Sequence, residues 1–310
     1  MRRWIFLFVW AIWFVFPPAF GNATDQLMAD IQYLASDRLE GRKTGSAGAA
    51  LARDYIRQQF VNAGLRPWQQ DYAQPFNYKA GFSDRHGINL IAVLPACQPN
   101  APVVLLSAHY DHLGIVAGKV HNGADDNASG VAMMLALARW LAVKCRPYQY
   151  WFVATDAEEN GLYGARHLVK AQHWQPAELA LVINLDMVGR YQRVPRLYWF
   201  GSTQLAGLKD WIVQQQLALP LRWRRTEESR YVRGKVDWAA ASDHAPFYRA
   251  GYPVLYFATA MHKDYHSPTD DWQAIKPEFI HQVFQTLQPI ILHLEQQPPA
   301  WFLAARRTDD

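Results

Sequence analysis

The chain has 310 residues, with 31 Lys or Arg and 27 Asp or Glu, so its formal net charge is +4. Half of the residues are apolar and only 19% are charged, a composition that excludes an intrinsically disordered chain. Arg2 and Arg3 belong to a segment that we expect to be removed, which leaves 29 − 27 = +2 for the rest of the chain. So small a charge predicts no nucleic-acid partner.

The first segment has the pattern of a secretory signal peptide. Arg2 and Arg3 precede an uninterrupted apolar run at 4–16, and the small residues Ala19 and Gly21 follow it. A membrane-spanning helix needs about 20 apolar residues, so the run is short for an anchor, although retention as an anchor is the alternative. We expect residues 1–21 to be a signal peptide and the rest of the chain to be exported, periplasmic or secreted, with no stable membrane span after cleavage.

Helices and strands alternate along the rest of the chain. Apolar residues recur at helical spacing at 25–36, 47–63, 130–143, 162–171, 205–217 and 277–295. Short apolar runs, typical of strands buried on both faces, cover 88–94, 102–108, 149–154, 179–185, 197–200 and 252–258. Residues 223–238 are polar and predict a surface excursion, and we expect the tail from Gln296 to be loose.

This alternation predicts an α/β fold with a mostly parallel central sheet and helices on both faces. Because no Pro-, Gly- or Ser-rich linker divides the chain, we expect a single domain at 22–310, with its core at about 26–295.

The two cysteines, Cys97 and Cys145, are too few for a scaffold built on disulfides. Each precedes an apolar run, at 103–108 and at 150–154. If these runs are neighbouring parallel strands, both cysteines lie at the same end of the sheet and are able to pair in an exported protein. Two separate buried thiols are the alternative, and the sequence leaves both open.

Side chains that are able to bind metal follow three of the predicted strands directly after each strand ends. They are His109, the pair Glu158 and Glu159, and Asp186. Ligands bind at the carboxyl ends of the strands in open parallel sheets, so we expect these side chains to converge. Two further clusters, at 125–127 and 264–267, are able to join them. Imidazoles and carboxylates that converge at one edge predict a divalent metal site.

Each group alone also has an ordinary explanation. His109 is compatible with a buried core histidine, and the glutamate pair with the positive end of the following helix. The cluster at 125–127 is compatible with a turn and a helix cap, and Asp186 with an arginine partner. Their common position at the strand ends makes a metal site the favoured interpretation.

The adjacent glutamates suggest a division of roles. Adjacent side chains usually diverge, so one carboxylate is able to bind metal while the other acts as a general base toward water. Asp111, two residues after His109 along an extended chain, is placed to accept the second ring N–H of that histidine, the usual support of a metal-bound imidazole.

In this order the motifs resemble those of the co-catalytic di-zinc aminopeptidases. The motifs are His109-x-Asp111, GADDNASG at 123–130, EENG at 158–161, NLDM at 184–187 and Tyr265-His266. The segments LEGRKTGSAG at 39–48 and SDHAPF at 242–247 are similar to further signatures of the family. These are secreted bacterial leucyl-type aminopeptidases, related to glutamate carboxypeptidase and glutaminyl cyclase. The resemblance covers about residues 26–295 and implies a zinc-exopeptidase, phosphorylase/hydrolase-like fold.

The resemblance also implies two Zn²⁺ ions per chain and a role for each matched residue. Asp126 would bridge the ions, His109 and Asp186 would complete one site, and Glu159 and His266 would complete the other. Glu158 would be the general base, Asp111 the partner of His109, and Tyr265 a stabiliser of the oxyanion. The family also places a cis peptide bond after the bridging aspartate, here between Asp126 and Asn127.

These implications describe a zinc-dependent exopeptidase. It would hydrolyse the first peptide bond of peptides with a free N-terminus, using water held by two zinc ions and Glu158 as base. Other readings are a glutaminyl cyclase-like acyltransferase, a dipeptidase or carboxypeptidase, and a catalytically dead binding protein on the same scaffold. Glutaminyl cyclase keeps one zinc and has Thr-Asp-Ser where this chain has Asp-Asp-Asn at 125–127. We expect a monomer.

Overall fold

A mixed nine-stranded sheet forms the centre of the computed structural model, which describes residues 23–172, 178–201, 203, 205–229 and 235–306. The strand order along the sheet is β1 (Arg66–Pro67), β3 (Ser83–Leu94), β7 (Gln149–Thr155), β4 (Val103–His109), β8 (Leu179–Leu185), β13 (Val254–Ala258), β9 (Leu197–Gly201) and β10 (Leu221–Trp223), with β2 (Ala73–Ala80) paired to β3. The predicted signal peptide at 1–21 lies outside the described residues.

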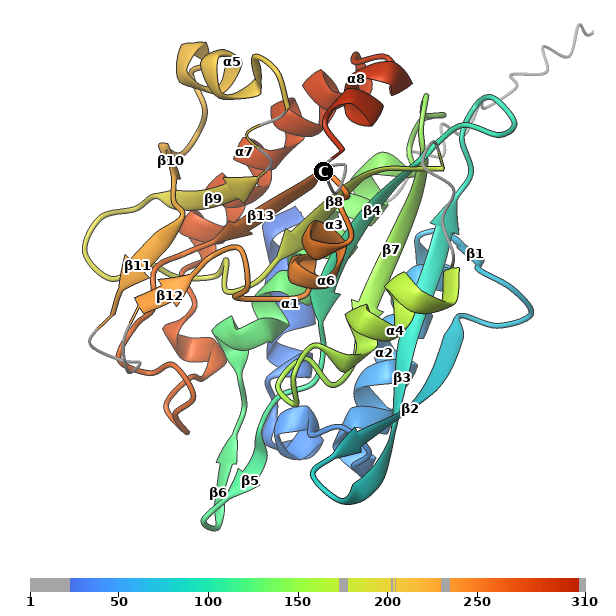
Figure 1. Cartoon of the computed structure of the whole chain (residues 1–310). Coiled ribbons are helices and arrows are strands. Elements are labelled where there is room, and N and C mark those ends of the chain that lie inside the picture. The colour runs from blue at the N-terminus through green and yellow to red at the C-terminus, as the bar shows by residue number, and fades with distance from the viewer. Residues whose placement is uncertain (1–22, 173–177, 202, 204, 230–234, 307–310) are drawn as a thin grey trace, which may run out of the picture.

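The four central strands are parallel. Strand β4 pairs in parallel with β7 on one side and β8 on the other, and β8 pairs in parallel with β13. Antiparallel pairs follow on both sides, β3 with β7 and β9 with β13. The carboxyl ends of the four central strands therefore lie at one edge of the sheet (Figure 1).

Helices cover both faces of this sheet. One face packs against α1 (Ala23–Leu34), α2 (Ala47–Asn62), α3 (Gly130–Leu141) and α7 (Pro277–Glu295), and the other against α4 (Tyr163–Gln172) and α6 (His244–Arg249). Alternate residues of β4 serve the two faces, since Val104 and Leu106 belong to the first core and Val103 and Leu105 to the second. These buried apolar runs explain why both faces need helices.

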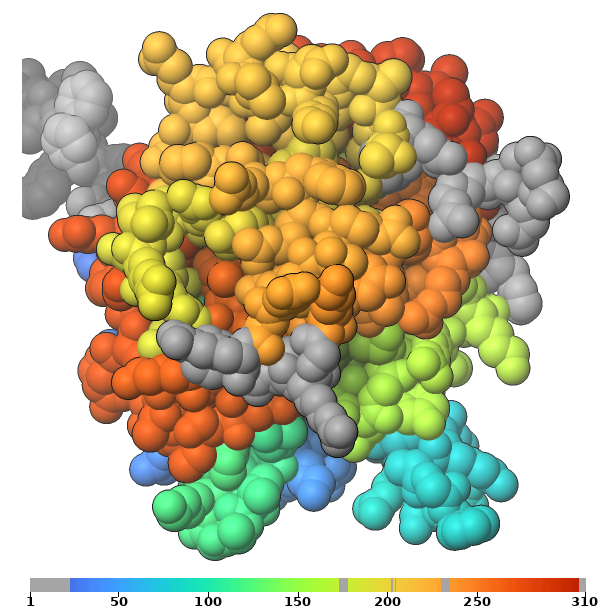
Figure 2. Space-filling model, turned by 60° about the vertical axis from the view of Figure 1, so that its left-hand side comes forward, coloured from blue at the N-terminus to red at the C-terminus, as the bar shows by residue number. Residues whose placement is uncertain are grey.

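Shorter elements connect and extend the sheet. They are the helices α5 (Leu208–Gln214) and α8 (Pro299–Ala304), the short turns of helix η1 (Asp37–Arg42), η2 (Ala124–Ser129) and η3 (Trp272–Ala274), and the hairpins β5–β6 (Gly114–Val116, Lys119–His121) and β11–β12 (Thr226–Glu228, Lys235–Asp237). The β5–β6 and β2–β3 hairpins stand out as separate projections at one end of the molecule (Figures 1 and 2). No helix among the described residues is long and apolar enough to cross a membrane.

The predicted α/β architecture is confirmed, and one expectation about the C-terminal tail is wrong. Residues after Gln296 are not loose as far as residue 306, because Pro299–Ala304 forms α8. Phe302 is 1% exposed and its ring meets the ring of Tyr148 edge-on at 5.5 Å. Ala305 is also 1% exposed, and Trp301 Nε1 donates to the carbonyl of Ala206 at 3.2 Å, so several contacts hold this part of the tail. The polar stretch at 223–238 contributes the small β11–β12 hairpin.

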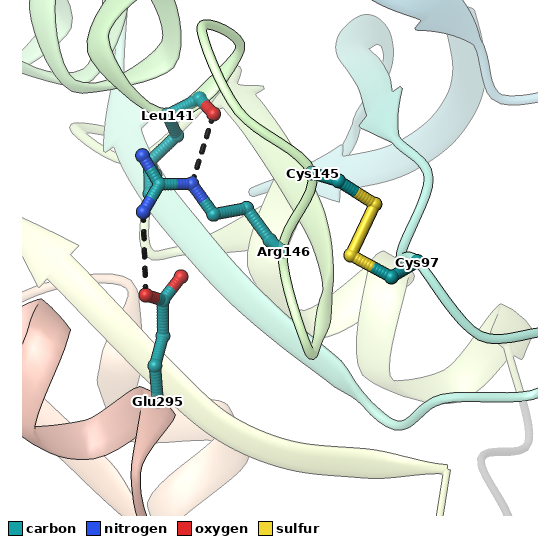
Figure 3. Close-up of a disulfide and its surroundings, with 5 residues drawn as sticks. All are labelled: Cys97, Leu141, Cys145, Arg146 and Glu295. Carbon is teal, nitrogen blue, oxygen red and sulfur yellow. Dashed lines mark hydrogen bonds and ion pairs between the residues drawn. A yellow bond between two sulfur atoms is a disulfide. The ribbon is translucent and has the colours of Figure 1, made fainter.

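Cys97 and Cys145 form a disulfide at the amino-terminal end of the neighbouring parallel strands β4 and β7 (Figure 3). The backbone N–H of Cys97 donates to the carbonyl of Arg146 at 2.7 Å. Arg146 links the disulfide region to α3 and α7. Its guanidinium donates to the carbonyl of Leu141 at 3.0 Å and pairs with Glu295 of α7 at 3.3 Å (Figure 3). Of the two possibilities that the sequence left open, the structure shows the paired one.

Replacing both cysteines by serine should lower the free energy of unfolding by about 2–4 kcal/mol, because the disulfide closes a loop of 48 residues that the unfolded chain would otherwise explore. Urea denaturation of wild type and the Cys97→Ser, Cys145→Ser variant measures the difference. Thiol titration of the denatured, unreduced wild type should find no free thiol; two free thiols would show that the pair does not form.

Candidate functional site

The three strand ends that the sequence singled out meet at one small cavity. Strands β7, β4 and β8 are neighbours in the sheet; His109 is the last residue of β4, Glu158 and Glu159 follow β7, and Asp186 follows β8. The cavity has a volume of about 30 Å³ and is lined by His109, Asp126, Glu158, Glu159, Asp186, Met187, Ala241, Tyr256, Met261, Tyr265 and His266. Every residue that we expected to bind metal is in this lining.

A first group of atoms that are able to bind metal surrounds the ring of His109. Its Nε2 lies 3.3 Å from Oδ1 of Asp126 and 3.5 Å from Oδ1 of Asp186. All three side chains are buried, and their donor atoms are close enough to bind one ion. Adjacent ligand atoms of a tetrahedral zinc are about 3.3 Å apart, since each zinc–ligand bond is about 2.0 Å long.

A second group surrounds the ring of His266. Its Nε2 lies 3.3 Å from Oδ2 of Asp126 and 3.1 Å from Oε2 of Glu159. Asp126 therefore offers one carboxylate oxygen to each group. This is the arrangement of a carboxylate that bridges two ions.

The donor set fits divalent metals. Buried charges need partners, and here four carboxylates (Asp126, Glu158, Glu159, Asp186) line one small cavity. Oδ1 of Asp186 is buried and has no hydrogen-bond partner among the described residues. Imidazole and carboxylate donors suit zinc, and cobalt and manganese accept the same atoms.

Glu158 is the carboxylate of the cavity that belongs to neither group. Burial, above all, raises the pKa of Glu158 well above its usual value, and the neighbouring carboxylate of Glu159 acts in the same direction. Burial alone would lower the pKa of His109, but the charges of Glu158 and Asp186 raise it well above its usual value. A buried carboxylate with a raised pKa beside the metal-binding atoms has the properties of a general base.

Asp111 contacts both the histidine and the glutamate pair. Nδ1 of His109 donates to the backbone carbonyl of Asp111 at 3.1 Å, while the Asp111 carboxylate lies farther away at 3.8 Å. That carboxylate accepts the backbone N–H groups of Glu158 at 3.0 Å and Glu159 at 3.3 Å. Asp111 is thus the neighbour of His109 that we expected, but its carboxylate mainly orients the turn that carries the two glutamates.

The turn before Asp126 is held by a second aspartate that the sequence reading did not single out. The carboxylate of Asp270 accepts the backbone N–H groups of Asp125 at 3.0 Å and Asp126 at 3.1 Å, and burial raises the pKa of Asp270 to about 6. Asp125 in turn lies 3.0 Å from Nε2 of His262. The peptide bond between Asp126 and Asn127 is cis, as the family resemblance implied.

The same turn is tied to the end of β8. The Asn127 amide donates to the carbonyl of Leu185 at 3.0 Å and accepts the N–H of Met187 at 3.2 Å. Oδ1 of Asp125 accepts the N–H of Gly189 at 2.7 Å. These bonds fix Asp186 relative to Asp126, so the polar cluster at 125–127 is more than a turn and a helix cap.

Arg42 ties three backbone segments together beneath the site. It is 1% exposed, and its guanidinium donates to four carbonyls: those of Leu34 at 2.5 Å, Tyr110 at 2.8 Å, Asn122 at 2.6 Å and Gly123 at 2.9 Å. Burial lowers the pKa of Arg42 only to about 10, so the side chain stays charged at neutral pH. Arg42 thus gives a structural role to one residue of the segment at 39–48.

Replacing Arg42 by Met should lower the free energy of unfolding by more than about 3 kcal/mol, because four buried carbonyls lose their donor and each unsatisfied group costs about 1–3 kcal/mol. Arg42→Lys should recover only part of the loss, since one ammonium lacks the planar fork that reaches all four oxygens. Chemical denaturation of the three proteins measures the effect. Equal stability of Arg42→Met and wild type would contradict this structural role.

Tyr265 lines the cavity beside His266. Its ring stacks on that of His266 with centroids 3.9 Å apart, and burial, above all, raises the pKa of its hydroxyl far above the usual value. The hydroxyl therefore stays protonated at neutral pH and is able to donate a hydrogen bond.

The SDHAPF segment supports the strand ends from the other face of the sheet. Ser242 accepts the amide of Asn184 at 2.8 Å, and Asp243 accepts the hydroxyl of Thr155. His244 is fully buried against Tyr256, with ring centroids 4.3 Å apart, and burial lowers its pKa to about 3. His244 is thus an ordinary buried histidine rather than a ligand.

One buried histidine near the site was missed. His112 lies three residues after His109 and donates from Nδ1 to Oε1 of Glu159 at 2.8 Å. Although burial and the charge of Asp126 act in the opposite direction, hydrogen bonds from His112 and His266 hold the pKa of Glu159 below its usual value. The signal was the sequence His109-Tyr110-Asp111-His112 itself, of which only the first and third residues were given a role.

The sequence matches one protein-family model and several curated proteins. A model of peptidase family M28 matches residues 89–291, about two thirds of the chain. Among curated relatives, "Alkaline phosphatase isozyme conversion protein" of Escherichia coli (strain K12) is 34% identical over a match that covers 47% of this chain and 46% of the relative. "Aminopeptidase YwaD" of Bacillus subtilis (strain 168) is 29% identical over a match that covers 65% of this chain and 43% of the relative. The chain thus spans about half the length of these two relatives. "Glutaminyl-peptide cyclotransferase" of Boiga dendrophila is 26% identical over 81% of this chain and 77% of its own.

Solved structures share the fold. BSAP, a zinc aminopeptidase from Bacillus subtilis, superposes with a TM-score of 0.71 and 16% identity over 93% of this chain and 98% of its own. Porphyromonas gingivalis glutaminyl cyclase superposes with a TM-score of 0.67 and 18% identity over 87% and 98%. With the match of the family model over most of the sheet and the site, these findings identify the chain as a member of peptidase family M28, a family of metallopeptidases with glutaminyl cyclases as relatives.

Proposed function

We propose that the protein is a zinc-dependent aminopeptidase with two metal ions at the end of the sheet. The observation that carries the proposal is the position of Asp126, whose two carboxylate oxygens each face a separate group of donor atoms. His109 and Asp186 would hold one ion with Asp126, and Glu159 and His266 the other. A pair of divalent ions supplies Lewis acidity and a water molecule of lowered pKa.

The chain's own residues would then act on the substrate. Glu158 would take a proton from the attacking water and give it to the leaving amine, because it is the carboxylate left over from metal binding. The protonated hydroxyl of Tyr265 would donate a hydrogen bond to the developing oxyanion. Asp111 would fix the positions of the two glutamates and of His109 relative to one another. The carboxylate-rich cavity would attract the free α-amine of a peptide.

Glutaminyl cyclization is the second candidate, because one such relative matches four fifths of the chain at 26% identity. The presence of two groups of donor atoms, one around His109 and one around His266, favours the two-metal peptidase over a one-zinc cyclase. Dipeptidase and carboxypeptidase activities use the same metal ligands and differ in the terminus that is recognised.

The export, domain organisation and oligomeric state of the protein form a separate part of the proposal. We propose that residues 1–21 direct export and that the rest of the chain is one catalytic domain acting as a monomer in the periplasm or outside the cell. The Cys97–Cys145 disulfide supports this, because disulfides persist in oxidising compartments.

A panel of peptides and aminoacyl chromogenic substrates tests the proposal. The expected result is release of the free N-terminal amino acid, loss of release with a chelator, and recovery with zinc, while N-acetylated peptides stay intact. Release of ammonia from N-terminal glutamine with formation of pyroglutamate would instead identify a cyclase. Release of C-terminal residues would identify a carboxypeptidase.

A further inference from the structure

A second imidazole, that of His112, lies against Glu159 and is buried, whereas the imidazole of His266 is exposed. His112 is 1% exposed, and its Nδ1 is 2.8 Å from Oε1 of Glu159, while Nε2 of His266 is 3.1 Å from Oε2. Each oxygen of this carboxylate therefore has its own histidine. The two imidazole rings meet edge-on, with centroids 5.8 Å apart.

The backbone around His112 leaves room for this ring and little else. A Cβ atom built on Gly123 would lie 2.5 Å from two carbon atoms of the imidazole, so only glycine is tolerated there. Gly123 begins the turn that leads to Asp126, with a φ of 55°. The position of the ring is thus fixed by the same turn that positions the bridging carboxylate.

The distances distinguish a hydrogen bond from shared metal coordination. The imidazole nitrogens of His109 and His266 lie 3.1–3.5 Å from two carboxylate oxygens each, as adjacent ligands of one ion do. Nδ1 of His112 is instead 2.8 Å from Glu159 and 3.9 Å from Asp126. The short contact is at hydrogen-bond distance.

The proton count supports the same assignment. A carboxylate that binds metal is ionised and has no hydrogen to donate, so the 2.8 Å contact requires the proton on Nδ1 of His112. A nitrogen that carries a proton does not bind a metal. If Nδ1 were a ligand, the proton would move to Nε2, which is buried without a hydrogen-bond partner among the described residues.

We propose that His112 is a positioning residue of the second metal site: its Nδ1–H holds Oε1 of Glu159, so that Oε2 alone faces the ion. This inference rests on the proposed two-metal function and adds a residue to it. Outer partners of metal ligands typically contribute about 10- to 100-fold to metal affinity. His112 would therefore govern the affinity of the second ion and leave the first, at His109 and Asp186, unchanged.

The test is competitive zinc titration of the metal-free protein, with folding verified by circular dichroism. His112→Leu removes the donor, and we expect one of the two zinc-binding steps, that of the ion at Glu159 and His266, to lose about 10- to 100-fold in affinity while the other step is unchanged. His112→Asn places an amide N–H near the position of Nδ1 and should stay within about threefold of wild type. His121→Leu, a control at another buried histidine whose Nδ1 lies 3.2 Å from the carbonyl of Lys119, should leave both affinities unchanged.

The absorption spectrum of the di-cobalt protein separates positioning from coordination. His112→Asn should keep the wild-type d–d bands if His112 is not a ligand. A changed spectrum, together with equal loss of zinc in the Asn and Leu variants, would show that His112 binds the metal and would overturn the proposal. Wild-type zinc affinity in His112→Leu would overturn it too.

The proposed function fails separately from this inference. If wild type binds two zinc ions but releases no amino acid from peptides, the aminopeptidase assignment fails, and the comparison of affinities among the His112 variants still holds. If wild type binds no second zinc, both fail.

Discussion

Glu158→Gln should reduce kcat/KM for an aminoacyl substrate by about 10²- to 10⁴-fold while both metals stay bound, because the amide keeps the shape of the side chain and loses its ability to accept a proton. The glutamate belongs to neither group of metal-binding atoms, and its backbone N–H bond to Asp111 at 3.0 Å does not depend on the side chain. Steady-state kinetics and metal analysis of the same sample measure the two effects.

Glu278→Gln is a matched control, since that glutamate lies exposed in the first turn of α7. It should retain wild-type kinetics. Full activity of Glu158→Gln would remove Glu158 from the mechanism. Loss of metal in the same variant would make it a ligand instead of a base.

Asp126→Ala should have the second large effect, reducing bound zinc from two ions to less than one per chain and abolishing activity. Both groups of donor atoms lose an oxygen at once, because His109 and His266 each lie 3.3 Å from a different oxygen of this carboxylate. Metal analysis after dialysis against a zinc buffer measures the loss. Asp71→Ala, which removes an exposed carboxylate paired with Arg57, serves as the control and should keep two ions.

Retention of two zinc ions in Asp126→Ala would contradict the bridging role. Retention of one tightly bound ion would show that Asp126 serves a single group. Folding of the variant must be confirmed first, because Asp126 is buried among charged neighbours.

The expectation that the strand-end residues meet followed from one feature of the sequence, buried apolar runs that end in polar residues. Parallel strands place such residues at one edge of the sheet, so His109, Glu158, Glu159 and Asp186 were expected to meet, and the structure brings them together. Asp126 and His266 lie outside the strands; the sequence named their clusters as able to join the site, and only the family resemblance gave each residue a role. Loop positions carry no periodicity from which spacing could be read.

The residues that were missed act through long-range backbone contacts. The side chain of Arg42 binds the carbonyl of Gly123, and that of Asp270 binds the backbone N–H of Asp125. These partners are far apart in sequence, and no local sequence pattern predicts such a pair. His112 was given no role from the sequence, although it stands three residues after His109. The role of His112 depends on which oxygen of Glu159 its Nδ1 contacts, and only the structure shows that contact. The helix α8 was missed because its contacts, the burial of Phe302 and the bond of Trp301 to Ala206, are long-range in sequence.

Anomalous diffraction from a crystal at the zinc absorption edge tests whether two metal ions share Asp126. We expect two peaks, one among His109, Asp126 and Asp186 and the other among Asp126, Glu159 and His266. A single peak, or two peaks that do not share Asp126, would contradict it.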